Sequence, residues 1–79
     1  MIQNNNVRKD TLKSIRVKFG YKQKEIADFL DVSVATYAKW EKNNSKMPLD
    51  KLQKLCEKYN VELTDIFIGD IRDYKRMLR

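Results

Sequence analysis

Apolar residues recur along most of this chain at spacings of three and four, the period at which side chains share one face of an α-helix. Leu12, Ile15 and Phe19 follow this spacing near the N-terminus. They predict an amphipathic first helix over about residues 7–19, and Gly20 stands where a glycine commonly ends a helix. We therefore expect a helix followed by a tight turn.

Two shorter segments with the same period follow. Residues 23–30 carry Ile26 and Leu30 on one face and predict a short second helix. Ser33 is a residue type that commonly caps the start of a helix, and a third helix is expected over residues 33–42. Because only a few residues separate the two segments, the pattern predicts a pair of helices joined by a tight connection.

A longer apolar repeat predicts a fourth helix over about residues 48–60. Pro48 suits the first turn of a helix, and Asn60 suits a helix end with a left-handed backbone. Cys56 falls on the apolar face of this segment, with no metal-ligand residues beside it. We interpret it as a small core residue and not as a reactive thiol or a metal ligand.

Two further short helices are expected, a fifth of one or two turns over residues 61–67 and a sixth in the tail. The inward-facing residues of both follow helical spacing: Leu63, Ile66 and Phe67 in the fifth, and Ile71, Tyr74 and Leu78 in the sixth. Asp70 precedes the tail segment as its expected cap, with Asp73 three residues further on.

No segment alternates apolar and polar residues over a useful length, so the sequence predicts an all-α protein. A chain of 79 residues is expected to form one domain. We predict a disordered N-terminal end over residues 1–6, a folded domain over residues 7–68 and a helical tail over residues 69–79.

Lysine and arginine outnumber aspartate and glutamate by 17 to 11, which gives a formal net charge of +6. An excess of this size on a small body favours a polyanionic partner, nucleic acid before membrane, although the charge by itself fits a purely solubilising role equally well. No apolar run approaches the ~20 residues of a membrane span, so no membrane association is expected.

The chain has no histidine and a single cysteine. The commonest general base and the commonest metal ligand are therefore missing, and no paired catalytic carboxylates are recognisable. We predict no enzymatic activity, no catalytic residue, no metal, no cofactor and no small-molecule substrate. The unpaired thiol fits a reducing compartment, so a cytoplasmic location is expected.

The third segment, SVATYAKWE, has an unusually slim outer face. Tyr37 and Trp40 fall on one arc of the helix, and Ala35 and Lys39 fall on the opposite arc. Small side chains beside a cationic one allow a helix to approach the major groove of DNA closely. The alternative is a surface helix whose alanines only favour helix formation, and periodicity alone does not decide between the two.

The third segment belongs to a longer pattern, in which four segments follow one another along the chain: LKSIRVKFG, YKQKEIADFLDVS, VATYAKWE and MPLDKLQKLCEKYNVELTDIF. Together they span Leu12 to Phe67, and the chain resembles the phage-repressor-like helix-turn-helix domains of the Cro/CI or XRE type. The resemblance implies a compact five-helix lambda-repressor-like DNA-binding domain, with the helix-turn-helix unit at about residues 23–42 and a short sixth helix. The family usually has glycine in the inter-helix turn, whereas this chain has Asp31.

The resemblance also implies which residues contact DNA. Base-reading positions are expected at Ser33, Val34, Ala35 and Lys39. Phosphate contacts are expected at seven positions around the same surface: Lys22, Gln23, Thr36, Lys42, Asn43, Asn44 and Lys46. For the two asparagines, simple turn chemistry is nearly as good an explanation.

Arg16 and Glu41 carry opposite charges on the core-facing edges of the first and third helices. Family members with these residue types at these places form an ion pair between the two helices. We expect the same pair here, because a half-buried charge without a partner is costly. The alternative is two unrelated surface charges.

The sequence therefore predicts a small transcriptional regulator that binds double-stranded DNA sequence-specifically, most simply a repressor. One short helix reads few bases, so we expect a homodimer on an inverted-repeat operator, joined through the C-terminal helices. Those helices could instead only cap the monomer core. An antitoxin or a protein-interaction adaptor, in which DNA binding is secondary, is the alternative function.

Overall fold

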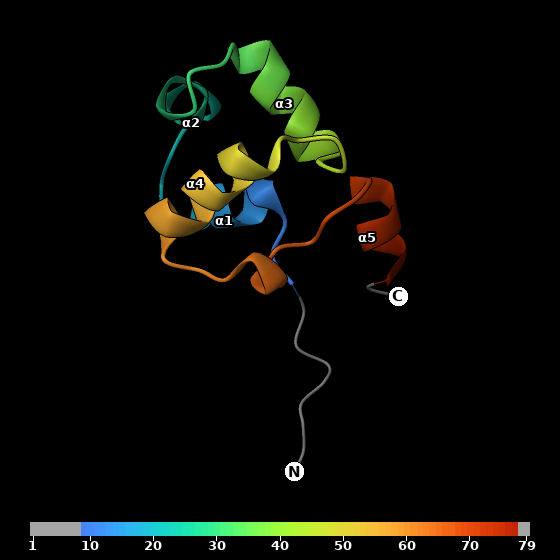
Figure 1. Cartoon of the computed structure of the whole chain (residues 1–79). Helices are drawn as coiled ribbons and strands as arrows, with labels where there is room; N and C mark the ends of the chain where they lie inside the picture. The colour runs from blue at the N-terminus through green and yellow to red at the C-terminus, as the bar shows by residue number, and fades with distance from the viewer. Residues whose placement is uncertain (1–8, 78–79) are drawn as a thin grey trace.

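The computed structural model describes residues 9–77, and this part of the chain folds into helices packed around one core (Figure 1). In chain order these are α1 (Leu12–Lys18), α2 (Gln23–Phe29), α3 (Val34–Lys42), α4 (Leu49–Tyr59), the single 3-10 turn η1 (Leu63–Asp65) and α5 (Ile71–Met77). Within residues 9–77 no strand forms beyond two isolated bridges. The predicted all-α class is confirmed, and the predicted N-terminal end over residues 1–6 lies outside the described part.

Helix α1 begins later than its apolar pattern predicts. The Thr11 hydroxyl accepts a hydrogen bond from Ser14 N at 3.0 Å, and the Ser14 hydroxyl accepts one from Thr11 N at 2.9 Å. This reciprocal capping box starts the helix at Leu12. Asp10 instead pairs with the distant Ile66 in an isolated parallel bridge. The prediction of a helix from residue 7 is therefore wrong for residues 9–11, and residues 7 and 8 are outside the described range.

The turn between α2 and α3 has the geometry that the helix pair requires. Asp31 takes the left-handed conformation with φ of 60°, so aspartate fills the place where the resembling family has glycine. Val32 N donates to Ala27 O at 3.0 Å and closes the end of α2. The Ser33 hydroxyl then accepts from Thr36 N at 3.1 Å, which caps α3 as predicted.

The core lies between α1, α2, α3 and α4 and extends to the segment that follows η1. Its largest fully buried side chains come from all of these elements: Ile15, Ile26, Leu30, Tyr37, Leu55 and Ile66. Ala27 is also buried, and α2 and α3 are in direct contact. Cys56 is buried on the inner face of α4, which confirms its interpretation as a core residue.

The predicted fifth helix is only the 3-10 turn η1. Ile66 leaves the helical conformation, with φ of −108° and ψ of 131°, because its segment pairs with Asp10 instead. Asp10 N donates to Asp65 O at 2.9 Å, and Phe67 N donates to Asp10 O at 2.8 Å. Ile66 is buried as expected, but Leu63 is 40% exposed, so its predicted inward position is wrong.

The tail forms the predicted last helix, α5, beside the C-terminal end of α3 (Figure 1). Asp70 forms an isolated bridge with Asn43 and accepts from Arg72 N at 2.8 Å, which places it at the start of the helix. The Tyr74 hydroxyl donates to Lys9 O at 2.7 Å, and its ring packs edge-on against Phe67 at 5.1 Å. The expected inward residue Leu78 lies outside the described part of the chain.

Candidate nucleic-acid interface

Helix α3 exposes to solvent the arc of small side chains that carries Ala35 and Lys39. Ala35 and Lys39 are exposed, whereas Tyr37 on the opposite arc is 0% exposed and lies in the core. Trp40 is partly buried and packs against the same core. The helix is therefore anchored from behind by two aromatic side chains, and its small, cationic face is free within the described residues.

The other two residues predicted to read bases lie at the start of α3. Ser33 and Val34 are both exposed, and Val34 keeps a large apolar side chain in solvent. The Ser33 hydroxyl is engaged twice, as acceptor for Thr36 N and as donor to the Thr36 hydroxyl at 3.0 Å. All four predicted base-reading residues are thus exposed at the N-terminal side and middle of one helix.

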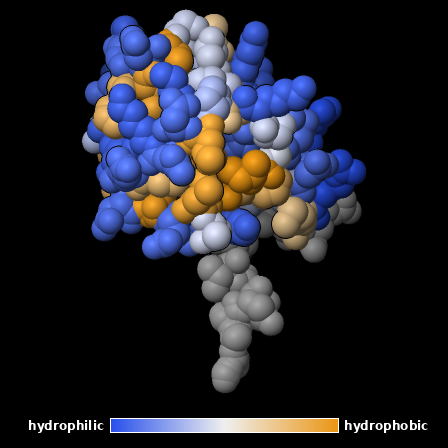
Figure 2. All heavy atoms as spheres, in the orientation of Figure 1, coloured by the Kyte–Doolittle hydropathy of each residue, from blue (hydrophilic) through white to orange (hydrophobic). Residues whose placement is uncertain are grey.

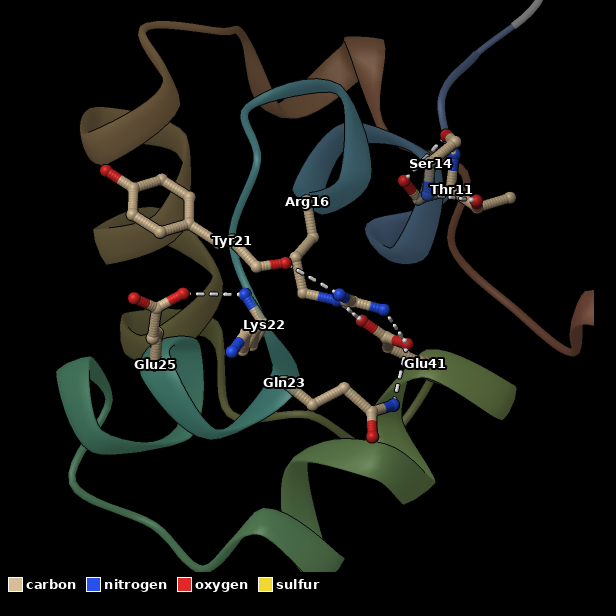
Figure 3. Close-up of polar contacts among 8 residues, drawn as sticks. All are labelled: Thr11, Ser14, Arg16, Tyr21, Lys22, Gln23, Glu25 and Glu41. Atoms are coloured by element: carbon tan, nitrogen blue, oxygen red, sulfur yellow. Dashed lines mark hydrogen bonds and ion pairs between the residues drawn. The ribbon is translucent and has the colours of Figure 1, made fainter.

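Arg16 and Glu41 form the expected ion pair behind this surface. Arg16 Nε donates to Glu41 Oε2 at 2.6 Å and Nη2 donates to Oε1 at 3.3 Å, and the two side chains are only 10% and 5% exposed. Arg16 Nη1 also donates to Tyr21 O at 2.8 Å, and Gln23 Nε2 donates to Glu41 Oε1 at 3.0 Å (Figure 3). One carboxylate therefore connects α3 to α1 and to the start of α2.

The surroundings keep this pair ionised. Burial by itself would raise the pKa of Glu41, but the hydrogen bonds from Arg16 and Gln23 outweigh it and hold that pKa below its usual value. The hydrogen bond to Glu41 likewise raises the pKa of Arg16 against the effect of burial. Burial and then the charge of Glu41 raise the pKa of the nearby Tyr37 hydroxyl, which stays neutral.

Gln23 was predicted as a phosphate contact, and its side chain is held in place by Glu41. An amide nitrogen carries two hydrogens, so one N–H of Gln23 is used by Glu41 and the other is left for a further acceptor. Lys22 is exposed, but its backbone N–H donates to Glu25 Oε1 at 2.8 Å. That N–H is therefore already satisfied and does not form the open anion site that a helix start can provide.

The remaining predicted phosphate contacts differ in their surroundings. Lys42, Asn43 and Lys46 are exposed at the end of α3 and in the loop after it, and Thr36 is half-buried. Asn43 Oδ1 accepts from Ser45 N at 3.0 Å and from the Ser45 hydroxyl at 2.7 Å, which is the turn chemistry that the sequence left open.

Asn44 requires a correction. Its side chain is buried, and the residue is only 5% exposed. Asn44 Nδ2 donates to Phe67 O at 3.1 Å, and Oδ1 accepts from Gly69 N at 2.8 Å. Both ends of the amide are used inside the molecule, so Asn44 holds the loop after α3 against the segment that leads into α5. Its prediction as a phosphate contact is wrong, because the side chain is not accessible.

Two features of this region were not predicted from the sequence. The Tyr21 carbonyl that accepts from Arg16 has no signal in the side-chain pattern, because any residue type offers a carbonyl. The hydrogen bond between Gln23 and Glu41 joins residues 18 positions apart, and only the resemblance that places both near the same helix pair points to it.

Residues 9–77 hold no group of three or more acidic, cysteine or histidine side chains that could bind a metal ion. Within the same range, none of the helices has the length and apolar character needed to cross a membrane. The geometry offers an exposed cationic surface around α3, and such a surface is suited to contact with an extended anion.

Comparison with known proteins agrees with this geometry. A family model described as helix-turn-helix matches residues 12–66, which spans α1 to the residue after η1. The matched region includes the ion pair, the turn at Asp31 and all of α3. No curated protein shows significant sequence similarity to the chain.

Proposed function

We propose, because the chain belongs to the helix-turn-helix family of the Cro/CI or XRE type, that it binds duplex DNA sequence-specifically and represses transcription. Membership of this family supports a DNA-binding regulator in general. The sequence specificity, the repressor role and the residues in contact with DNA are our proposal. The observation that carries it is the exposure of Ala35 and Lys39 on a helix whose other side is anchored by Tyr37.

In the proposed complex α3 enters the major groove with its slim arc toward the base edges. The Lys39 ammonium donates to guanine O6 or N7, and the side chains of Val34 and Ala35 contact thymine methyl groups. Ser33 lies at the start of the same helix and completes the base-reading set. This set has few long polar side chains, so part of the specificity comes from DNA shape.

Phosphate contacts position the helix on the duplex. Gln23 is the principal one, because Glu41 holds its side chain and one amide hydrogen remains for a phosphate oxygen. The exposed ammonium groups of Lys22, Lys42 and Lys46 supply the electrostatic part. Thr36 and Asn43 complete the proposed set, and Asn44 is left out because it is buried.

We further propose that two copies bind an inverted repeat, since one short helix reads too few bases to find a site alone. The C-terminal part carries exposed apolar side chains suited to a contact between copies: Leu63, Ile68 and Met77. A symmetric dimer places two α3 helices on successive major grooves of one DNA face. The preferred site is then a palindrome.

Selection of bound sequences from random duplex DNA tests this function. The wild-type chain is expected to select an inverted repeat. Lys39→Ala is expected to change the preferred bases, because it removes a base contact, and Gln23→Ala to weaken all sequences alike, because it removes a phosphate contact. Lys54→Ala on α4 removes the same charge as Lys39→Ala away from the proposed surface, and it should change neither property. Selection of no sequence by the wild-type chain contradicts the proposal.

A further inference from the structure

The surface between α1, α3 and α5 is hollowed into an open groove with a volume of about 890 Å³. Its walls are mostly apolar and include Val17 of α1, Ala38 of α3, and Ile71 and Tyr74 of α5. Figure 2 shows that apolar side chains gather on part of the face of the molecule drawn there, among hydrophilic ones. The volume lies within the range of roughly 300–1,000 Å³ that is common for small-molecule sites.

The rim of this groove is cationic, with four lysines among its lining residues: Lys13, Lys18, Lys42 and Lys75. Lys18 pairs with Asp10 at 3.3 Å, whereas within residues 9–77 the other three lysines form no ion pair. Among residues 9–77, Glu41 is the one carboxylate that lines the groove, and Arg16 already neutralises it. The groove therefore combines apolar walls with uncompensated positive charge at its edge.

Both walls of the groove are held in place by the fold. The α5 wall is fixed at its start by the bridge between Asn43 and Asp70, and in its middle by the hydrogen bond from Tyr74 to Lys9 O at 2.7 Å. The opposite wall is α1, whose N-terminus is capped by Thr11. A preformed groove of this kind loses little freedom when a ligand enters.

We propose that this groove binds a small organic anion with an apolar body, such as an aliphatic or aromatic carboxylate, and that the bound anion weakens DNA binding. The apolar body lies against Val17 and Ile71, and the carboxylate lies at the lysine rim. The predicted effect on DNA binding rests on the proposed function, because Gln23 and Lys42 line the groove and are also proposed phosphate contacts. A carboxylate beside Lys42 competes with a DNA phosphate for the same ammonium group.

Titration of the DNA-free chain with decanoate, followed by amide NMR spectra, tests the site. Saturable shifts are expected at groove residues of α1, α3 and α5. Decanol has the same apolar body without the charge and should bind about tenfold more weakly, because it gains no attraction from the lysines. Equal binding of the two probes overturns the proposed role of the lysines, and the absence of saturable decanoate binding overturns the site.

A matched pair of variants locates the binding. Val17 is 57% exposed inside the groove, and Leu49 is 56% exposed outside it, so glutamate is tolerated by the fold at either position. Val17→Glu should abolish decanoate binding by placing a negative charge in the groove, and Leu49→Glu should leave it unchanged. Lys75→Gln should weaken it. Equal effects of the two glutamate variants, or binding of an acidic peptide but not of decanoate, overturn the proposal.

The effect of the bound anion on DNA binding, the regulatory half of the proposal, is measured in a separate experiment. Decanoate should raise the dissociation constant for a selected DNA site by about fivefold or more in the wild-type chain, and it should have no such effect in Val17→Glu. Decanoate bound in the groove with unchanged DNA affinity overturns this half. DNA affinity without decanoate tests the proposed function alone, so a failure there is distinguishable from a failure of the groove.

Discussion

Glu41 joins the first three helices through one buried carboxylate. Arg16 approaches it from α1 and Gln23 from the start of α2, while Glu41 itself projects from α3. Removing the charge of one partner leaves the other buried without compensation, which commonly costs about 3–5 kcal/mol. The pair also sets the orientation of Gln23, so it connects the stability of the domain to its proposed phosphate contact.

Glu41→Gln is therefore expected to lower the free energy of unfolding in urea by about 3–5 kcal/mol at neutral pH. Asp28→Asn serves as the control, because Asp28 pairs with Lys24 on the exposed face of α2 and such surface pairs contribute at most about 1 kcal/mol. Equal losses in the two variants contradict a special role of the buried pair.

The free energies of unfolding of the wild-type chain and of Glu41→Gln are expected to depend differently on pH. The pKa of Glu41 is lower in the folded chain than its ordinary value of 4.5, so the folded state binds fewer protons than the unfolded state. Its contribution is fully present above the ordinary value and is lost as the pH falls through the folded value. The wild-type chain should lose more stability than Glu41→Gln when urea unfolding is repeated at decreasing pH below about 4.5.

At the scale of elements, the apolar period predicts α1 to α4 well, because each of them buries residues of one face in the core. It also predicts α5, although no residue of that helix is fully buried. Boundaries are less accessible to sequence reasoning where a distant partner sets them. The capping box of Thr11 and Ser14 starts α1, and the pairing of Asp10 with Ile66, which lies 56 positions away in the chain, keeps the preceding residue out of the helix and shortens η1. A local pattern carries no information about such a pair.

In the candidate site, too, some features could be predicted from the sequence and others could not. Exposure of Ala35 and Lys39, burial of Tyr37 and the ion pair at Glu41 follow from the period of one helix and from the family resemblance. Asn44 was misplaced because an asparagine in a polar loop is ordinarily exposed. Its amide instead satisfies the backbone of the segment before α5, a contact set by the tertiary path of the chain.

Asn44→Ala is expected to destabilise the fold by about 1–3 kcal/mol, because it leaves the partners of a buried amide unsatisfied. Amide hydrogen exchange at Gly69 should become faster, since Asn44 Oδ1 accepts from that N–H. Asn43→Ala provides the neighbouring control and should cost less than about 1 kcal/mol, because its side chain is exposed. A protected Gly69 amide in Asn44→Ala contradicts the structural role of Asn44.

At the scale of the whole molecule, two kinds of surface meet at α3. The cationic face around α3 is presented by a core that reaches from α1 to the residue after η1, the region that the family model matches. Helix α5 lies outside that match and contributes the second wall of the groove beside α3. Gln23 and Lys42 line this groove and also belong to the proposed DNA contacts, and the proposed coupling between ligand and DNA rests on these shared residues.

A single-atom exchange in the major groove of a selected DNA site tests directly whether Lys39 reads a base there. Replacing the guanine opposite Lys39 by 7-deazaguanine removes the N7 acceptor, and wild-type affinity should fall by about 1–3 kcal/mol. The same DNA should bind Lys39→Ala no more weakly than the unmodified site does. Replacing guanine by inosine instead changes only the minor groove. Binding that tolerates 7-deazaguanine at every position but is weakened by inosine contradicts the docking of α3 in the major groove.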